Sequence, residues 1–428
     1  MDRGSRTDVP SSAHFRIEQG QLAVDGVRLE QIAAEVGTPT HVYSASAIRS
    51  AYRAIDAALG GSRHLICYAM KANGHPAILR LLAELGAGAD VVSGGELHWA
   101  LRAGIPAERI VFSGVGKTDV ELAAALDAGI RAIHVESEGE LDAIERLARA
   151  RGVRARIALR VNPDVDPETH PYIATGLHDT KFGLAIDVAR RLLPRILGSA
   201  ELALDGIAAH IGSQISGAQP MEDAVAIVAA FAKECADAGA PIRAIDAGGG
   251  WPIHYGDEDV PFAPWEAFGE AIRRGIVRGG AAELDLDVVV EPGRALVGDA
   301  GALLTRVIFV KEQASKRFVI VDAAMTELVR PSLYGAYHAV MPVAAREGEA
   351  ALADVVGPVC ETADFLALGR PLPPVERGDL LLVRGTGAYG ASMATRYNAR
   401  PLAAEVLVDE GAYRVIRARE RIEDLHPA

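Results

Sequence analysis

Residues 64–97, HLICYAMKANGHPAILRLLAELGAGADVVSGGEL, contain two short apolar runs of β-strand character, each followed by a polar or glycine-containing turn. An Ala/Leu-rich segment of helical character separates them, and the alternation continues along the chain. Eight units of this kind predict a (β/α)8 barrel rather than an open doubly wound sheet. The eight apolar runs are HLICYAMK (64–71), ADVVS (89–93), IVFSG (110–114), AIHVES (132–137), RIALRVNP (156–163), LDGIAAHIGS (204–213), AIDAGGG (244–250) and LDVVVEPGR (286–294).

Three consecutive turns carry the S/T-x-x-E pattern of a capping box, in which a hydroxyl and a carboxylate satisfy the first backbone N–H groups of a helix. They are Ser93–Glu96, Thr118–Glu121 and Ser137–Glu140. Gly129 and Gly152 follow two of the helical segments, where a left-handed residue commonly ends a helix. These signals support the strand–turn–helix order of the barrel.

The pattern changes near residue 298, after which strands follow one another without long helices. We therefore expect the barrel to span residues 41–297 and a mainly antiparallel C-terminal β domain to span residues 298–428. Residues 1–40 include FRIEQGQLAVDGVRL and are expected to pack with the β domain. The strands expected in that domain are RVIFVKE, RFVIVDAA, DLLLVRG and AAEVLVD.

Composition narrows the function classes. The chain has 44 Lys and Arg residues against 57 Asp and Glu residues, a net charge of −13, so a nucleic-acid partner is not expected. Its apolar runs are far shorter than the ~20 residues that span a bilayer, so no membrane partner is expected either. The three cysteines (67, 235 and 360) are widely spaced and form no CxxC pair, which predicts a cytoplasmic protein without a metal site.

The polar residues that follow each barrel strand are the candidate site, because active sites of (β/α)8 barrels form at the carboxyl ends of the strands. One amine, one imidazole, several carboxylates and glycine-rich turns fit a phosphorylated cofactor that is bound through an amine. In chain order they are Lys71, Asp90, Ser93, Glu136, Arg160, Asn162, His210, Ser213, Gly248 to Gly250, Glu291 and Arg294.

From position alone, each candidate also has a purely structural interpretation. Lys71 follows an apolar strand, where a partly desolvated amine becomes nucleophilic, but it could simply reach the rim or pair with Asp90. His210 could be a hydrogen-bonded structural residue. The glycines at 248–250 could form a tight turn, although three in a row expose backbone N–H groups suited to an anion. Glu291 could pair with Arg294 in a Pro-Gly turn, or it could keep a pyridine nitrogen protonated.

Two nucleotide-binding patterns fail on inspection. Gly116-Lys117-Thr118 resembles the end of a Walker A motif, but the required first glycine is Val111. Gly385, Gly387 and Gly390 satisfy GxGxxG, yet too few residues follow them to build a dinucleotide-binding half.

Taken together, nine motifs closely resemble the diaminopimelate decarboxylase family, over roughly residues 20–425. That family belongs to the fold-type III pyridoxal-phosphate enzymes, which combine an alanine-racemase-like barrel with a β domain. The motifs are YAMKAN (68–73), DVVSGGEL (90–97), KFGL (181–184), HIGSQ (210–214), GGGW (248–251), EPGR (291–294), DAAMTELVRPSLYGAYH (322–338), GPVCETAD (357–364) and GAYGASMATRYN (387–398).

The resemblance implies a role for each matching residue. Lys71 attaches pyridoxal 5'-phosphate, His210 stacks on its ring and Glu291 contacts its pyridine nitrogen. Cys360 and Glu361 match residues that a partner subunit contributes, with Cys360 as proton donor, which implies a homodimer with shared active sites. The other cofactor contacts implied are Asp90, Ser213, Gly248, Gly249, Gly250, Pro292, Gly293, Arg294 and Tyr389, and the substrate contacts are Arg294, Arg330, Tyr334, Glu361 and Tyr389.

The expected reaction is decarboxylation of meso-2,6-diaminopimelate to L-lysine and CO2, the last step of lysine biosynthesis. The alternatives are a related decarboxylase of ornithine or carboxynorspermidine type and a non-catalytic homologue that binds the cofactor. Arg330 argues against ornithine, which has no distal carboxylate to pair with it. Lys71 and Cys360 argue against a non-catalytic protein. Without the other motifs, Arg330 to Tyr334 would be a surface turn and Cys360 a small buried hydrophobic residue.

Overall fold

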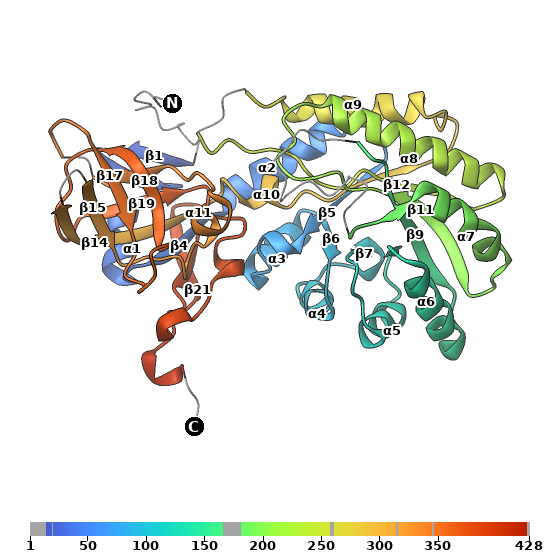
Figure 1. Cartoon of the computed structure of the whole chain (residues 1–428), viewed down its shortest axis with the longest axis horizontal. Helices are drawn as coiled ribbons and strands as arrows, with labels where there is room; N and C mark the ends of the chain where they lie inside the picture. The colour runs from blue at the N-terminus through green and yellow to red at the C-terminus, as the bar shows by residue number, and fades with distance from the viewer. Residues whose placement is uncertain are drawn as a thin grey trace. The chain divides into compact units, whose positions relative to one another are not determined.

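The computed structural model describes residues 14–18, 20–165, 181–256, 261–313, 316–344 and 346–425. The chain forms two compact units (Figure 1). The barrel unit comprises residues 51–252 and 260–295, and the β unit comprises residues 1–50, 253–259 and 296–428. None of the helices in the described ranges has the length and apolar character needed to cross a membrane.

The barrel unit is a closed sheet of eight parallel strands, as the sequence predicts. Each strand pairs with the next, and the last pairs with the first. Each predicted apolar run overlaps one strand, although β6, β9 and β11 begin one or two residues before the run. In order around the barrel, they are β5 (His64–Ala69), β6 (Gly88–Val91), β7 (Ile110–Phe112), β8 (Ala132–Val135), β9 (Ala155–Asn162), β11 (Leu202–Ala208), β12 (Ala244–Asp246) and β13 (Asp287–Val290), while the short β10 (Leu184–Ala185) pairs with the end of β9.

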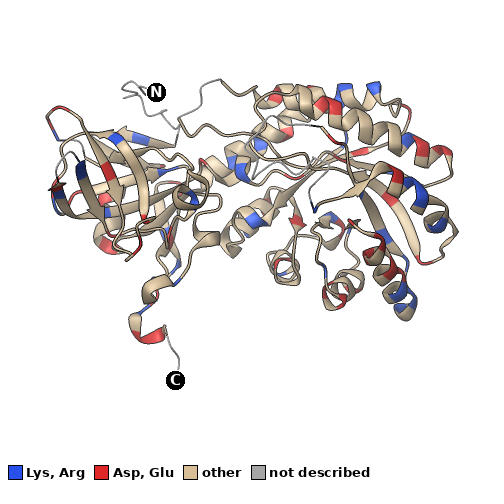
Figure 2. Ribbon diagram, viewed as in Figure 1, with Lys and Arg blue, Asp and Glu red and all other residues tan. Residues whose placement is uncertain are grey.

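Helices follow the strands and cover the barrel from outside (Figure 1). Their bounds are α3 (Pro76–Glu84), α4 (Gly94–Arg102), α5 (Asp119–Ala128), α6 (Glu138–Arg151), α7 (Ile186–Gly198), α8 (Gln219–Asp237) and α9 (Trp265–Arg278), with α2 (Ala45–Ala58) preceding β5 and α10 (Arg294–Val297) following β13. Figure 2 shows acidic and basic residues interspersed along these helices. Some form ion pairs between neighbouring helices, such as Arg190 of α7 with Glu234 of α8.

The predicted helix ends are observed, with one difference in detail. The side chains of Ser93, Thr118 and Ser137 each accept a hydrogen bond from the N–H group three residues on, and Gly129 and Gly152 end α5 and α6 in the left-handed conformation. Only α5, among these three helices, has the reciprocal capping box. The glutamates of the other two accept a hydrogen bond from the residue before the cap instead, which fastens each helix to the strand end that precedes it.

The β unit is mainly antiparallel, as predicted, although β15–β17 and β4–β20 pair in parallel. A three-stranded sheet of β1 to β3 and helix α1 contribute to one core with the C-terminal strands. The elements are β1 (Phe15–Glu18), β2 (Gln21–Val24), β3 (Val27–Arg28), α1 (Leu29–Glu35), β4 (Thr40–Ser44), β14 (Gly301–Gln313), β15 (Lys316–Val321), α11 (Arg330–Tyr334), β16 (Val340–Pro342), β17 (Ala351–Val356), β18 (Phe365–Leu372), β19 (Leu380–Arg384), β20 (Ala404–Asp409) and β21 (Ala412–Arg417).

Strand β4 differs from the sequence expectation, because four of its five residues, 41–44, fall in the segment assigned to the barrel (41–297). It pairs with β14 and β20 in the β unit. All five of its residues, THVYS, are buried. Strand periodicity identifies such a strand but cannot say which sheet it joins, since both of its faces are buried and no exposed face marks its place.

Substitution of Gly269 tests how closely α9 packs against α2 in the barrel unit. A Cβ atom at this position would lie 1.9 Å from the carbonyl oxygen of Ala58, at the end of α2. We expect Gly269→Ala to lower the free energy of unfolding by about 1–3 kcal/mol, because the helix must move away. The control is Gly139→Ala on α6, where, apart from its chain neighbours and the backbone of its own helix, no atom of the described residues lies within 4 Å of the added methyl group. That change should leave stability unchanged or raise it by up to about 1 kcal/mol. Urea unfolding measures both, and equal midpoints for the two variants would contradict the packing.

Candidate functional site

Lys71 lies just after the first barrel strand, in the short 3-10 helix Met70–Ala72. The neighbouring strand places Asp90 opposite Ala69, so the carboxylate lies beside this helix. Lys71 Nζ is 3.3 Å from Asp90 Oδ2, and the Asp90 side chain is completely buried while that of Lys71 is 41% exposed. The contact with Asp90, which the sequence left as one of two alternatives, is therefore present, and it holds an accessible amine at the carboxyl end of the barrel.

The glycine run begins two residues after the end of β12 and packs against His210. The Gly248 N–H donates to Asp246 Oδ1 at 2.8 Å, and the Gly249 N–H donates to His210 Nδ1 at 3.0 Å. Gly248 has φ +69°, and a Cβ there would lie 2.5 Å from the carbonyl oxygen of Ala209. Only glycine allows the backbone to approach this closely.

His210 is an uncharged ring in this setting. Because Nδ1 accepts the hydrogen bond from Gly249, the ring proton is assigned to Nε2. Burial, together with the positive charges of Lys71 and Arg160, lowers the pKa of His210 well below its ordinary value. A neutral, flat imidazole can therefore lie against an aromatic ligand without adding a charge.

Ser213 and Arg294 add a hydroxyl and a guanidinium group to the same unit. Arg294 begins α10 and is 8% exposed, and its Nη2 and Nε atoms lie 3.2 and 3.4 Å from Ser213 Oγ. Gly250 lies against the preceding loop, since a Cβ on it would be 2.7 Å from the Gly212 carbonyl oxygen. Serine, arginine and glycine-rich turns are the groups that proteins use to bind phosphate.

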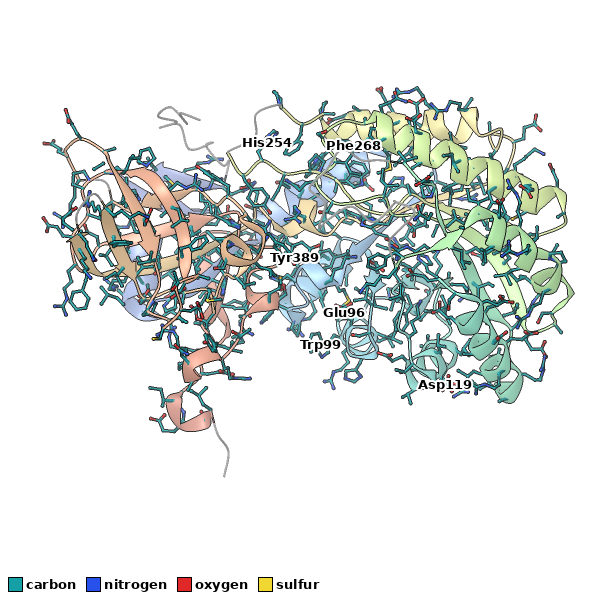
Figure 3. The ribbon with its side chains drawn as sticks, in the orientation of Figure 1. Glu96, Trp99, Asp119, His254, Phe268 and Tyr389 are labelled. Atoms are coloured by element: carbon teal, nitrogen blue, oxygen red, sulfur yellow. The ribbon has the colours of Figure 1, made fainter. Side chains whose placement is uncertain are left out.

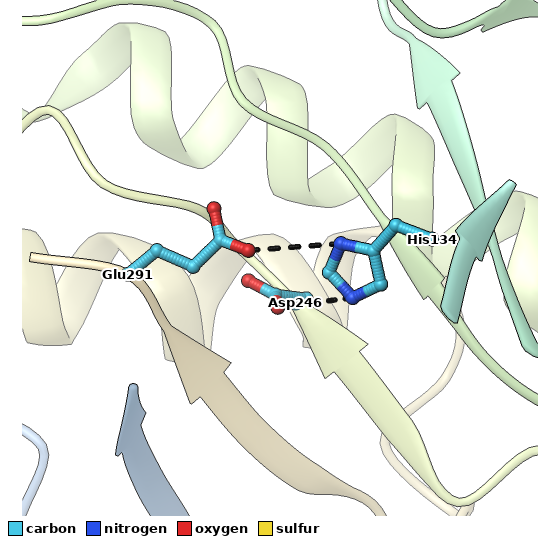
Figure 4. Close-up of side chains that lie close together, drawn as sticks. All are labelled: His134, Asp246 and Glu291. Atoms are coloured by element: carbon cyan, nitrogen blue, oxygen red, sulfur yellow. Dashed lines mark ion pairs between the residues drawn. The ribbon is translucent and has the colours of Figure 1, made fainter. Parts of the chain in front are cut away.

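Glu291 belongs to a buried cluster that includes His134 and Asp246 (Figure 4). His134 Nδ1 lies 3.6 Å from Glu291 Oε1, and its Nε2 lies 3.6 Å from Asp246 Oδ2. Ser113 Oγ joins the cluster at 3.1 Å from His134 Nδ1 and donates to Glu291 Oε1 at 3.3 Å. The imidazole therefore stands between two carboxyl groups that come from different strands.

Burial disfavours the charged form of each ionisable group in this cluster. Burial, with the charges of Asp246 and Asp90, raises the pKa of Glu291 well above its ordinary value, in spite of the opposing charges of Lys71 and Arg160. Burial likewise raises the pKa of Asp246 to about 7 and lowers that of His134 to about 3. A bound cation would stabilise the charged carboxylates here.

Glu136 and Arg160, two further strand-end candidates, form a buried ion pair with each other at 2.9 Å. Glu136 also accepts hydrogen bonds from the N–H groups of Gly114 at 2.7 Å and Gly183 at 3.0 Å. Asn162 accepts a hydrogen bond from the N–H of Asp164. The contacts of all three residues thus join loops and strand ends of the barrel unit.

Sequence reasoning did not single out Ser113, His134 or Asp246. His134 lies in the middle of a strand whose other residues are apolar, and Asp246 is the last residue of its strand. A polar side chain within a buried apolar run was the available signal.

Five further candidates lie in the β unit. Arg330 begins α11 and is 7% exposed, while Tyr334 ends the helix and is 39% exposed. Tyr389 follows β19 with φ +59° and is labelled in Figure 3. Cys360 and Glu361 are exposed in the loop between β17 and β18, and the Cys360 N–H donates to Asn398 Oδ1 at 3.0 Å. Cys360 is therefore not the buried hydrophobic residue that its position alone would allow.

The residues of the barrel unit suit pyridoxal phosphate. Asp90 Oδ1 is buried and has no hydrogen-bond partner in the part of the chain that the structure describes. Glu291 is a second buried carboxyl group, and its pKa is raised. Two buried carboxyl groups of this kind favour a protonated pyridine ring. Lys71 offers the amine, and Ser213, Arg294 and the glycine run offer phosphate ligands.

Comparison with known proteins agrees with this geometry. The family described as pyridoxal-dependent decarboxylase, pyridoxal binding domain, matches residues 45–298. Diaminopimelate decarboxylases of Aquifex aeolicus and Pseudomonas aeruginosa are 45% and 46% identical to this chain, over 96% of its length and 96% and 97% of theirs. The crystal structure of diaminopimelate decarboxylase from M. jannaschii in complex with L-lysine superposes with a TM-score of 0.92, at 36% identity and 96% coverage of both chains. The resemblance predicted from the motifs is confirmed, and this chain belongs to the diaminopimelate decarboxylase family.

Proposed function

We propose that this protein is a pyridoxal-phosphate-dependent carboxy-lyase that converts meso-2,6-diaminopimelate to L-lysine and CO2, the last step of lysine biosynthesis. One observation carries the proposal most directly. The accessible amine of Lys71 is held 3.3 Å from the buried Asp90, in the same barrel as the buried carboxyl group of Glu291. An amine and an uncompensated acid are the two groups that a pyridoxal cofactor requires at its opposite ends.

The barrel unit would hold the cofactor through several residues. Lys71 provides the attachment, His210 a neutral ring, and Glu291 a carboxylate that keeps the pyridine nitrogen protonated. The phosphate group is assigned to Ser213, Arg294, Gly248 to Gly250 and the backbone of Pro292 and Gly293. When bound, pyridoxal phosphate supplies an electron-withdrawing ring that accepts the electron pair left on the substrate carbon as CO2 departs.

The remaining roles belong to residues of the β unit. Cys360 Sγ delivers the proton that replaces the lost carboxylate on the D-configured carbon. Arg330, with Arg294 of the barrel unit, binds the distal carboxylate, and Glu361 binds the distal ammonium group. Tyr334 and Tyr389 make further substrate contacts, and Tyr389 also contacts the cofactor. Selection for a substrate that carries an amino-acid group at both ends needs both charges.

The proposal includes a homodimer in which Cys360 and Glu361 enter the site of the partner subunit. Their exposure supports this, because a residue that serves a neighbouring molecule must be accessible. It also includes a cytoplasmic location. In support, the three cysteines are all free.

Lys71→Ala tests the proposed reaction. The purified protein with pyridoxal phosphate and meso-diaminopimelate should release CO2 and L-lysine in equal amounts. The variant should lose activity by about a thousandfold or more, because the amine that attaches the cofactor is gone. Lys311→Ala, at an exposed position of β14, is the matched control and should retain full activity.

Two results would redirect the proposal. A protein that attaches the cofactor through Lys71 but makes no lysine would favour an ornithine or carboxynorspermidine type of substrate. Attachment of the cofactor with no CO2 from any of these substrates would favour a non-catalytic homologue.

Asp246→Asn tests the buried charge imbalance. The folded-state pKa of about 7 lies above the ordinary value of 3.8, so the folded chain binds more protons than the unfolded chain between these pH values. The contribution of this carboxyl group to stability is therefore present at low pH and is lost as the pH rises toward 7. In the cofactor-free protein, the variant should gain stability relative to the parent between pH 5 and pH 8, by about 1 kcal/mol or more.

Urea unfolding at several pH values measures this effect. Glu283→Gln, an exposed change in the turn before β13, is the control and should follow the parent curve. Parallel stability curves for Asp246→Asn and the parent protein would contradict the assignment.

A further inference from the structure

Arg330 is held on one nitrogen by two side chains of the β unit. Its Nη1 donates to Tyr255 Oη at 3.1 Å and lies 2.8 Å from His338 Nε2. Arg330 is 7% exposed and His338 is completely buried. These buried contacts therefore fix the orientation of the guanidinium group, unlike that of a flexible surface arginine.

The hydrogen bonds of His338 determine which of its nitrogens carries the proton. Its Nδ1 lies 2.8 Å from the backbone carbonyl oxygen of Arg384, which can only accept. A guanidinium group can only donate, so Nε2 must accept from Arg330 and Nδ1 must carry the hydrogen. A proton on both nitrogens would place an N–H group against the guanidinium N–H. The contact thus needs a neutral imidazole in one tautomer.

The ring of Tyr255 completes the arrangement. The guanidinium carbon of Arg330 lies 4.9 Å from the ring centre, and the rings of Tyr255 and His338 meet edge to face at 5.2 Å between centroids. Gly385 has φ +67°, and a Cβ there would lie 3.1 Å from two carbons of the Tyr255 ring. The glycine at the start of the false GxGxxG motif therefore makes room for this ring.

We propose that His338 is a positioning residue: together with Tyr255 and the carbonyl of Arg384 it forms a guanidinium clamp that presents Arg330 to the distal carboxylate of the substrate. This inference rests on the proposed function, in which Arg330 binds that carboxylate. Holding Nη1 aims the other donors of the planar guanidinium in advance, so less side-chain freedom is lost when the substrate binds. The clamp should therefore change substrate binding more than the chemical step.

The test compares two replacements of His338 in the cofactor-loaded enzyme. The amide of His338→Asn can still donate to the Arg384 carbonyl but offers no acceptor at the position of Nε2. The longer His338→Gln can place an acceptor there. We expect His338→Asn to raise KM for meso-diaminopimelate about tenfold with kcat within about twofold, and His338→Gln to raise KM by about threefold or less.

A matched ligand isolates the distal carboxylate. D-lysine is meso-diaminopimelate without that group, so its inhibition constant should stay within about twofold of the parent value in His338→Asn and in Arg330→Ala. In the Arg330→Ala background, His338→Asn should cause no further rise in KM, because the clamp acts through the arginine.

Three outcomes would overturn the clamp in an enzyme that makes lysine: an unchanged KM in His338→Asn, an equal rise in both backgrounds, or an equal loss of D-lysine binding. Should His338→Asn not fold by circular dichroism, Tyr255→Phe replaces it, since it keeps the ring and loses only Oη. That variant should raise KM about threefold, and an unchanged KM would again overturn the clamp. Failure of the parent protein to make lysine would instead reject the proposed function.

Discussion

The site in the barrel unit depends on the pairing of the last barrel strand with the first. In that pairing, Val290 of β13 lies opposite Ile66 of β5, and the Ala69 N–H donates to the Pro292 carbonyl oxygen at 3.2 Å. More than two hundred residues of chain separate these partners. Without closure, Lys71 and Glu291 would stand at opposite edges of an open sheet. Closure brings the motifs YAMKAN and EPGR to the same end of one barrel.

A second constraint is the excess of buried acid inside the barrel. Asp90, Asp246 and Glu291 are all buried, and burial raises the pKa of both Asp246 and Glu291. Such an arrangement disfavours the empty protein and favours one that holds a cation among these groups. The excess of buried acid therefore lowers the stability of the cofactor-free form, and it favours the binding of a protonated ring.

In the β unit, the side chain of an arginine is likewise held in position by its neighbours. Arg330 and Tyr255 are distant in sequence, yet the guanidinium is hydrogen bonded to the tyrosine and faces its ring. Gly385, part of a pattern that resembles a nucleotide-binding motif, has a packing role instead. A glycine pattern reports where the backbone or a neighbour needs space, and the surrounding fold determines what uses that space.

The sequence by itself determined the eight strands, the helix caps after three of them, the antiparallel character of the second domain and the family. These follow from local periodicity, capping chemistry and motifs that are contiguous in the chain. It also predicted Lys71, His210 and Glu291, because each stands at a strand end. Only the tertiary structure decided that β4 joins the second sheet, that His134 lies between two carboxyl groups, and that His338 holds Arg330. The reason is physical: burial, tautomer and hydrogen-bond partner are set by groups from distant strands, and no local pattern in the chain records which of those groups will meet.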